Sequence, residues 1–476
     1  MKEKEKVKHV SKDPLPGSLV QKDGKIPCRF EFGNHDVKLY IFLTRGFQPR
    51  AFRRRMRRLH LRTMNTEPSI QTATILDMGD DRMLGQQDDG RKVWLDGPVV
   101  PGDVVRFRQE GKGGVVLSVL EPAADRIPAP CPLFDRCPGC RLQPLPAKRQ
   151  LELKADRIVQ TLERLGGLKE IPFHGVRATK AEYGTRNKLD FTVDGPRLGY
   201  RSGDGLADVS DCLLGDRLLR DWIPRVREWL GAHPDHNLHR CMLRTDGERN
   251  GVWMLLRGEL AHDERNSWQK LFQDSDDLKG IGIQADWKQP WETLAGALDL
   301  RFALHGKEHS VQADGFFQVH DRLAGDLVGA VMDRLEQGRV GNLLDLFCGT
   351  GAFTLPAANI ADRVLGLDSR PGQGPFQKAD LRRGLPPKVL NQSWRTVLTD
   401  PPRAGMDKRL VGQLRDQVRA DRILYISCNP ATLARDLQRL MAKGDYQVTY
   451  VEGFDLFPQT PHVETVVELK NVRARL

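Results

Sequence analysis

The chain has 476 residues, a length that corresponds to about three domains. Hydrophobic residues make up 39% and charged residues 29% of the sequence, which excludes a disordered or collagen-like chain. The net charge of +11 indicates a polyanionic partner, either nucleic acid or an anionic membrane surface. All of this excess lies in residues 1–63, which contain 17 Lys and Arg against 6 Asp and Glu, whereas residues 64–476 contain 57 of each.

The sequence contains no apolar run of about 18 residues, so we expect no transmembrane helix. It begins with Met-Lys-Glu-Lys-Glu-Lys and continues without an apolar stretch, which argues against a secretory signal and favours the cytoplasm. Eight cysteines are too few for a disulfide scaffold in a chain of this length. We therefore expect them to be metal ligands, nucleophiles or small buried residues.

Residues 1–66 are predicted to form a basic, disordered N-terminal extension. Its Arg-rich run at residues 50–62 is typical of a solvated tail, but such a run can also bind nucleic acid. A third interpretation places the natural start at Met64, so that the extension is absent from the mature protein.

Residues 67–125 contain short β runs separated by turns, which predict a small closed barrel. Residues 126–310 are predicted to form an α+β central domain that begins with a Pro- and Cys-rich loop. An amphipathic helix is expected over residues 151–165, because the apolar pattern ends at Gly166-Gly167. Strands of the central domain are expected at residues 189–193, 252–256 and 298–304.

Helix and strand signals alternate over residues 311–476. A helix is expected at residues 321–335, and buried strands at 342–347, 364–368, 396–400 and 423–427. Strands that alternate with helices indicate a parallel sheet with right-handed crossovers. The predicted fold class is therefore α/β, with a Rossmann-like C-terminal domain, a small N-terminal β-barrel and an α+β central domain.

A glycine turn follows the first strand of this sheet, in the segment Asp-Leu-Phe-Cys-Gly-Thr-Gly at residues 345–351. Glycines at the carboxyl end of a first strand let the backbone approach a ligand closely. Asp368 ends the next strand, where a carboxylate can bond ribose hydroxyls. No Lys-Ser or Lys-Thr follows the glycines, which excludes a triphosphate-binding loop. The pattern favours a nucleoside of the S-adenosylmethionine kind over an ordinary glycine turn.

Three further segments place polar residues beside the sheet. Asp400 begins Asp-Pro-Pro-Arg, where Arg403 replaces the aromatic residue of enzymes that methylate exocyclic amines, which argues against that reaction. Cys428 follows the next strand, at the edge where α/β proteins bind ligands. Glu464 lies in a Pro-rich loop that enters a strand, and Gly-Phe-Phe-Gln-Val-His at residues 315–320 precedes the sheet. A lone cysteine is usually a small buried residue, but Cys428 accompanies these other motifs.

Together these motifs resemble the S-adenosylmethionine-dependent RNA uracil-5 methyltransferases. The resemblance covers residues 68–476, where Phe-Phe-Gln-Val, Asp-Leu-Phe-Cys-Gly-x-Gly, Asp-Pro-Pro-Arg-Ala-Gly, Ser-Cys-Asn-Pro and His-Val-Glu-Thr occur in the family's order. The barrel is similar to the family's TRAM domain. Thr-Arg-Asn-Lys at residues 185–188 is similar to its central-domain signature.

The resemblance implies a covalent mechanism, because carbon 5 of uracil is too weak a nucleophile to attack a sulfonium methyl group directly. Addition of the Cys428 thiolate to carbon 6 creates an enolate that can attack, and Glu464 then removes the carbon 5 proton. Asp400 and Gln318 hold the uracil edge, and Phe316 stacks on a base turned out of the RNA. The implied S-adenosylmethionine-binding residues are Gln318, Asp345, Phe347, Gly349, Gly351, Asp368, Asp380 and Asp400.

Four cysteines form a candidate metal site. Cys131, Cys137 and Cys140 are closely spaced, and Cys212 follows 72 residues later. Three neighbouring thiolates and one remote thiolate suit either a tetrahedral zinc ion or an iron–sulfur cluster, and their spacing does not separate the two. Resemblance to the family branch that modifies 23S ribosomal RNA implies a [4Fe–4S] cluster, with zinc as the alternative. Its role would be structural or RNA-positioning, since methyl transfer needs no electron.

The sequence departs from the family's pattern between Asp368 and Asp400, which are only 32 positions apart. Pro-Gly-Gln-Gly-Pro at residues 371–375 stands where the first crossover helix should begin, and helix interiors exclude such residues. We therefore expect this helix to be missing and one wall of the cofactor pocket to be altered. Asp380 is expected to follow the third strand, near the adenine amino group. His320 stands where the family usually has asparagine.

The sequence thus predicts an enzyme that methylates carbon 5 of a uridine in 23S ribosomal RNA, without membrane association or an obligate protein partner. One alternative is the transfer-RNA branch, which usually lacks the barrel and the four cysteines. Another is an RNA-binding relative that lost cofactor affinity through the shortened crossover, although the intact Cys428, Asp400 and Glu464 argue against it. Because residues 64–476 are formally neutral, we expect RNA binding through local patches and shape.

Overall fold

The computed structural model describes residues 26–30, 39–43, 69–203, 205–371 and 374–473. The chain divides into two compact units, Met1–Ser69 and Ile70–Leu476. In the first unit, β1 (Ile26–Phe30) pairs antiparallel with β2 (Leu39–Leu43). The Arg-rich run at residues 50–62 lies outside the described residues, so its role stays a prediction. Among the described helices, none has the length and apolar character needed to cross a membrane.

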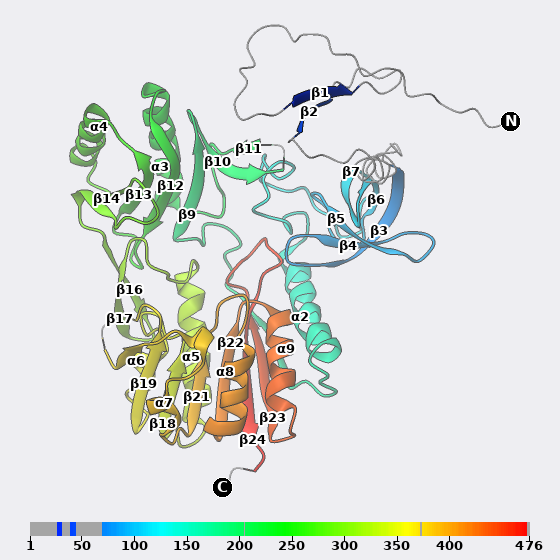
Figure 1. Ribbon diagram of the computed structural model, residues 1–476, viewed down its shortest axis with the longest axis vertical. Coiled ribbons are helices and arrows are strands. Elements are labelled where there is room, and N and C mark those ends of the chain that lie inside the picture. The colour runs from blue at the N-terminus through cyan, green and yellow to red at the C-terminus, as the bar shows by residue number, and fades with distance from the viewer. Residues whose placement is uncertain (1–25, 31–38, 44–68, 204, 372–373, 474–476) are drawn as a thin grey trace, which may run out of the picture. The chain divides into compact units, whose positions relative to one another are not determined.

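Five strands of the second unit form the expected closed barrel (Figure 1). They are β3 (Ile70–Met78), β4 (Met83–Gln86), β5 (Lys92–Asp96), β6 (Val104–Glu110) and β7 (Gly113–Glu121). Strand β3 closes the barrel because it pairs with both β4 and β6. Residues alternate between the two faces of a strand, so Val93 and Leu95 are buried whereas Trp94 is exposed.

A seven-stranded sheet follows the barrel in the chain, in the order β11-β10-β9-β12-β13-β14-β15. Its strands are β9 (Lys188–Asp194), β10 (Arg197–Ser202), β11 (Gly205–Asp208), β12 (Asn237–Thr245), β13 (Val252–Glu259), β14 (Leu278–Gln284) and β15 (Glu292–Gly296). The helices α3 (Arg217–Ala232) and α4 (His262–Gln273) pack into one apolar cluster with this sheet, and Trp229 of α3 stacks on Trp268 of α4. A hairpin of β16 (Asp299–Leu304) and β17 (Lys307–Gln312) then leads to the last sheet.

The last sheet has eight strands, in the order β20-β19-β18-β21-β22-β24-β23-β8. The strands are β8 (Phe173–Arg177), β18 (Asn342–Leu346), β19 (Arg363–Asp368), β20 (Phe376–Lys378), β21 (Thr396–Thr399), β22 (Arg422–Ser427), β23 (Tyr446–Phe454) and β24 (Glu464–Asn471). The first five strands in sheet order, from β20 to β22, run parallel, and β24 lies antiparallel between β22 and β23. This reversal brings the start of β24 beside the end of β22.

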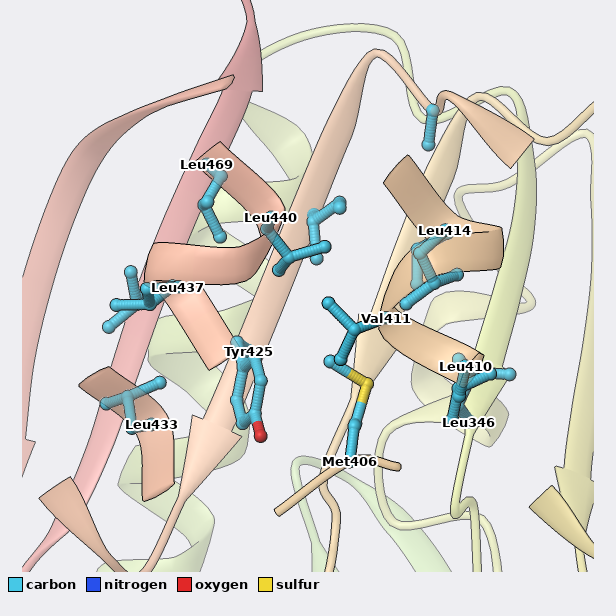
Figure 2. Packing of buried hydrophobic residues seen from close by; sticks show 14 of the residues in the cluster. Leu346, Met406, Leu410, Val411, Leu414, Tyr425, Leu433, Leu437, Leu440 and Leu469 are labelled. Atoms are coloured by element: carbon cyan, nitrogen blue, oxygen red, sulfur yellow. The ribbon is translucent and has the colours of Figure 1, made fainter. Parts of the chain in front are cut away.

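Helices cover both faces of this sheet. They are α2 (Ala147–Arg164), α5 (Asp321–Glu336), α6 (Thr354–Ala357), α7 (Pro387–Leu390), α8 (Lys408–Gln413) and α9 (Pro430–Met441), with a 3-10 turn at Leu381–Arg383 and a π turn at Leu414–Val418. Along β22, Leu424 and Ile426 pack on the side of α5, whereas Ile423 and Tyr425 pack on the side of α2, α8 and α9. Figure 2 shows this second layer around Tyr425. The predicted α/β class with a Rossmann-like domain is confirmed.

The connection from β19 to β20 is short. Only residues 369–375 separate these parallel strands, and the described residues among them contain no helix. A parallel crossover usually needs a dozen or more residues. The ring of Phe376 packs instead against Gly351 and Gly366. A Cβ added at either glycine would come within 2.6 Å of the ring, so a larger residue would displace it. The described part of this connection thus contains no crossover helix, and the Phe376 ring lies beside the glycine turn.

Candidate active site

The reversal of β24 determines the position of Cys428. Ser427, the last residue of β22, pairs with Thr465 of β24, so the next positions along the two strands are Cys428 and Glu464. Asn429 then caps the start of α9, because its Oδ1 accepts a hydrogen bond from the Ala431 amide at 2.9 Å. A cysteine and a carboxylate thus meet at the carboxyl end of the parallel strands, where ligands bind in such folds.

Two carboxyl groups act on this cysteine. Burial raises the pKa of Cys428 to about 11, and the charges of Glu464 and Asp400 add to the increase. Burial and the Asp400 charge also raise the pKa of Glu464 well above its usual range, and burial raises the pKa of Asp400 to about 7. Glu464 is 4% exposed, and its Oε2 atom has no hydrogen-bond partner within the described part of the chain. Buried polar atoms are rarely left unpaired, so this oxygen is free for a substrate.

Arg403 is the cation of this group, and the sequence reasoning did not assign it to the site. Its charge lowers the pKa of both Cys428 and Glu464. Its Nη2 atom lies 2.9 Å from the His462 ring, and burial together with Arg403 lowers the pKa of His462 to about 4. Arg403 stands only three residues after Asp400 in Asp-Pro-Pro-Arg, which is the signal that could have identified it.

The glycine turn after β18 has an unusual backbone. Phe347 has a φ of 62° although it is not glycine, and Gly349 and Gly351 have φ values of 53° and 88°. Such non-glycine strain persists mainly at functional sites. A Cβ at Gly349 would meet no atom within 4 Å, so this turn leaves open space for a ligand. Asp368 holds the turn from the next strand, because its Oδ2 accepts a hydrogen bond from the Gly349 amide at 3.1 Å.

Asp345 lies beneath this turn and is 1% exposed. It accepts a hydrogen bond from the Thr354 hydroxyl, while its Oδ1 has no partner among the described residues. Burial raises the pKa of Asp345 to about 8, and the charges of Asp400 and Asp368 contribute to the increase. Asp345, Asp368 and Asp400 therefore converge at three neighbouring strand ends, a position that suits the positive sulfonium and the hydroxyl groups of S-adenosylmethionine.

The raised pKa of Asp345 predicts how stability depends on pH. Between about pH 4 and pH 8 the folded protein binds more protons than the unfolded chain, so this residue makes folding less favourable as pH rises. Asp345→Asn should therefore stabilise the ligand-free protein by up to a few kcal/mol at pH 8 and much less at pH 5, since one pKa unit corresponds to about 1.4 kcal/mol. Urea unfolding at the two pH values measures this difference. Equal changes in the free energy of unfolding at the two pH values would contradict the assigned pKa shift. In addition, calorimetry should show that Asp345→Asn binds S-adenosylhomocysteine more weakly than the wild-type protein.

Asp380 follows β20 as expected, but its carboxylate is already engaged. It accepts a hydrogen bond from Arg382 Nε at 2.9 Å and caps the short turn that begins at Leu381. The Arg382 guanidinium lowers the pKa of Asp380. The contribution of Asp380 to an adenine site stays a prediction.

Phe376→Ala tests the altered wall of the cofactor pocket. Because the ring supports Gly351 and Gly366, its removal should cost about 2–3 kcal/mol of stability and weaken S-adenosylhomocysteine binding about tenfold. Phe376→Leu should restore most of both. Phe272→Ala, at a half-buried position on α4, is the matched control and should lose stability without changing affinity. Equal affinities for Phe376→Ala and the wild-type protein would show that the ring does not shape the pocket.

Phe316 and Gln318 lie on the segment that precedes α5. The Phe316 side chain is 75% exposed, and Gln318 is held through its carbonyl, which accepts a hydrogen bond from Asn187 Nδ2 at 2.9 Å. No hydrogen bond or ring contact of either side chain is found among the residues that the structure describes. The structure thus leaves both side chains free, and their contact with uracil stays a prediction.

The four cysteines line one small cavity, together with Tyr200 and Leu214. Cys131, Cys137 and Cys140 come from the loop after the barrel, and Cys212 comes from the loop before α3. Burial raises the pKa of the free thiols of Cys137, Cys140 and Cys212, while the Arg186 charge lowers it. In the described ranges no group of three or more His, Cys, Asp or Glu is arranged to hold a single metal ion. An all-thiol donor set suits either zinc or an iron–sulfur cluster, so the identity of the bound group stays a prediction.

Comparisons with known proteins identify relatives of this chain. A family profile described as tRNA (Uracil-5-)-methyltransferase matches residues 385–472. An uncharacterized RNA methyltransferase of Aquifex aeolicus is 30% identical over 405 residues, covering 78% of this chain and 91% of that protein. The 23S rRNA (uracil(1939)-C(5))-methyltransferase RlmD of Mannheimia succiniciproducens is 28% identical over 434 residues, covering 82% and 94%.

A solved structure has the same fold. The Pyrococcus abyssi tRNA (uracil-54, C5)-methyltransferase, determined with S-adenosyl-L-homocysteine, is 24% identical, with a TM-score of 0.64 over 83% of this chain and 100% of that chain. The fold, the site and these similarities define an S-adenosylmethionine-dependent RNA methyltransferase. More particularly, the chain belongs to the RNA (uracil-5-)-methyltransferase family.

Proposed function

We propose that this protein methylates carbon 5 of a uridine in 23S ribosomal RNA through a covalent adduct between uracil and Cys428. The observation that carries the proposal is the placement of Cys428 opposite Glu464 on paired strands, with Asp400 acting on both. The ribosomal RNA substrate of the Mannheimia relative supports the choice of RNA.

The reaction begins when the Cys428 thiolate adds to carbon 6, and the electron pair of the 5,6 double bond moves to the carbonyl oxygen on carbon 4. Bound S-adenosylmethionine would supply the methyl group that carbon 5 takes up, leaving S-adenosylhomocysteine, and the carbonyl on carbon 4 re-forms. The Glu464 carboxylate then removes the proton from carbon 5, the 5,6 double bond returns, and Cys428 leaves as a thiolate. Glu464 finally releases its proton to solvent.

The charged groups of the site suit this order of reaction steps. The raised pKa of Cys428 keeps the resting thiol protonated at neutral pH, which protects it from unwanted reactions. Arg403 stabilises the thiolate when it forms, because its charge lowers the pKa of Cys428. With a pKa of about 7, Asp400 can hold a proton and donate a hydrogen bond to the enolate oxygen. Gln318 holds the remaining edge of the base, and the exposed Phe316 ring stacks on it.

In the proposed domain organisation, residues 67–125 form a TRAM-type RNA-binding barrel, 126–310 the central domain and 311–476 the catalytic domain. Cys131, Cys137, Cys140 and Cys212 hold a [4Fe–4S] cluster, with zinc as the alternative, and this group supplies structural support rather than electrons. The protein acts in the cytoplasm on ribosomal RNA without an obligate protein partner.

The transfer-RNA reaction is the second candidate, because the matching family profile and the Pyrococcus abyssi structure both carry that description. The decisive experiment incubates the iron-loaded protein with cofactor labelled in its methyl group and with 23S ribosomal RNA or transfer RNA, both lacking the modification. Label recovered as 5-methyluridine in 23S RNA supports the proposal. Label in transfer RNA alone favours the second candidate, and another methylated nucleoside contradicts the mechanism. Zinc without iron or sulfide in an anaerobic preparation would contradict the cluster.

A further inference from the structure

One arginine, Arg249, joins two segments of the site. The first is the loop before α3 that contains Cys212, called the cysteine loop below, and the second is the segment that carries Phe316 and Gln318, called the uracil segment. Arg249 lies in the turn between β12 and β13, and its guanidinium contacts two aspartates. Its Nε donates to Asp216 at 2.8 Å, while Nη1 and Nη2 donate to the two oxygens of Asp321 at 2.8 and 2.9 Å. The three side chains are only 8–15% exposed, so water screens the interaction weakly.

Each of the two aspartates lies at the start of a helix. Asp216 caps the start of α3, four residues after Cys212, and Asp321 is the first residue of α5, three residues after Gln318. Helix α3 packs on the seven-stranded sheet, whereas α5 packs on the eight-stranded sheet (Figure 1). A single guanidinium therefore fixes the beginnings of two helices, each of which directly follows a loop with a proposed function.

A backbone connection runs beside this ion pair. The Arg186 amide donates to the Leu214 carbonyl at 2.9 Å, and the Asp216 amide donates to the Arg186 carbonyl at 2.9 Å. The next residue, Asn187, donates from its amide to the Val319 carbonyl at 2.8 Å and from Nδ2 to the Gln318 carbonyl at 2.9 Å. Two adjacent residues thus bind the cysteine loop on one side and the uracil segment on the other.

The backbone conformation of Arg249 is strained for a residue with a side chain, which indicates that the contacts of this side chain compensate for the strain. Its φ is 62°, a left-handed conformation that costs a non-glycine residue free energy, and glycine would adopt it without strain. Arg249 Nη1 also donates to the Asp246 carbonyl of its own turn at 2.8 Å, which fixes the guanidinium in place. A lysine would retain the charge but not the planar, bidentate contact.

We infer that Arg249 is a positioning residue that couples the four-cysteine site to the uracil-binding segment. When the cysteine loop is intact, Arg249 and Asn187 hold residues 315–321 in the position that presents Phe316 and Gln318 to the base. This inference rests on the proposed function and assigns the four-cysteine site a mechanical role in it.

Hydrogen exchange measured by mass spectrometry on the full-length, iron-loaded protein tests the coupling without relying on activity. In Arg249→Met and in Asp216→Asn, amides of residues 315–321 should exchange at least about tenfold faster, although Asp216 is not part of that segment. Arg249→Lys should be intermediate. Arg240→Met is the matched control, because Arg240 makes a similar bidentate contact with Asp190 at 2.6 Å on the neighbouring strand and should leave residues 315–321 unchanged.

Kinetics provide the second readout. In Arg249→Met the single-turnover rate constant at saturating RNA should fall about tenfold while the reaction amplitude stays at the wild-type level, because a small misplacement slows the chemical step. A fall in amplitude alone would indicate partial unfolding and overturn the positioning role. Faster exchange confined to residues 211–221 would overturn the coupling. A wild-type protein that methylates no uridine would refute the proposed function, yet the exchange data would still decide the coupling.

Discussion

Replacing Cys428 with alanine should lower the single-turnover rate of methyl transfer on the order of 10⁴-fold or more, the scale expected when a covalent nucleophile is lost. The physical reason is that Cys428 is the thiol on which Glu464, Asp400 and Arg403 act, whereas Cys348, the other thiol at a described strand end, is buried against Gly366. The binding of S-adenosylhomocysteine should change less than threefold, because the glycine turn and Asp368 are held by contacts that do not include Cys428. Rapid-quench kinetics and calorimetry measure the two quantities.

Cys241→Ala is the control for this experiment. Cys241 is fully buried in β12 and contributes to the apolar core of the seven-stranded sheet. Its replacement should reduce stability modestly and leave the methyl transfer rate within twofold of wild type. If Cys428→Ala retained more than a tenth of the wild-type rate, carbon 5 would have to be activated in another way, and the covalent mechanism would be wrong.

The sequence predicted the strand ends of the catalytic sheet well because local patterns define them. The buried β runs end at Leu346, Asp368, Thr399 and Ser427, so that Asp345, Asp368, Asp400 and Cys428 each lie within one residue of a strand end. Parallel strands place such ends along one edge whatever the details of the loops. Glu464 joined them because it begins a strand that returns antiparallel to β22. The closed barrel and the short β19–β20 connection were likewise predictable from turn residues and from glycine and proline content.

The roles of residues that act through tertiary contacts could not be predicted from the sequence. Phe376 looks like an ordinary strand residue until its ring is found against Gly351 and Gly366. Arg249 is one of many arginines in the chain, and only the fold brings it between Asp216 and Asp321. The helix predicted at residues 151–165 also begins earlier, at Ala147, because Pro146 precedes it with the extended backbone of an N-terminal boundary. Contacts between segments distant in sequence decide the roles of Phe376 and Arg249, whereas the helix start depends on the local backbone at Pro146.

The site holds more carboxyl groups than a resting protein can easily ionise. Burial raises the pKa of Asp345, Asp400 and Glu464 and so favours their protonated forms, and the Asp400 charge adds to this increase at Asp345 and Glu464. A positively charged sulfonium near Asp345 and Asp400 would favour ionisation of these groups. Cofactor binding is therefore expected to release protons, which couples the charge state of the catalytic site to the presence of the methyl donor.

Glu464→Gln should stop the reaction after methyl transfer, because the amide has the shape of the carboxyl group but cannot remove the carbon 5 proton. Cys428 then cannot leave, and the methylated RNA stays bound to the protein. Denaturing electrophoresis with labelled RNA should show a covalent complex that reaches at least half of the protein, compared with a few per cent in the wild-type enzyme. Turnover should fall at least about 10³-fold, within the range that general base catalysis contributes.

The same variant should make Cys428 more reactive, since the Glu464 charge helps to raise its pKa. Iodoacetamide should therefore alkylate Cys428 faster in Glu464→Gln than in wild type at pH 9, where Cys428 is still mostly a thiol. Glu452→Gln is the matched control, because Glu452 is also buried in this sheet but pairs with Arg177 and Tyr450 away from Cys428. Glu452→Gln should form no more covalent complex than the wild-type protein. A Glu464→Gln protein that turned over normally and left no adduct would assign the proton abstraction to another group. Asp400 would be the candidate, because its charge acts on both Cys428 and Glu464.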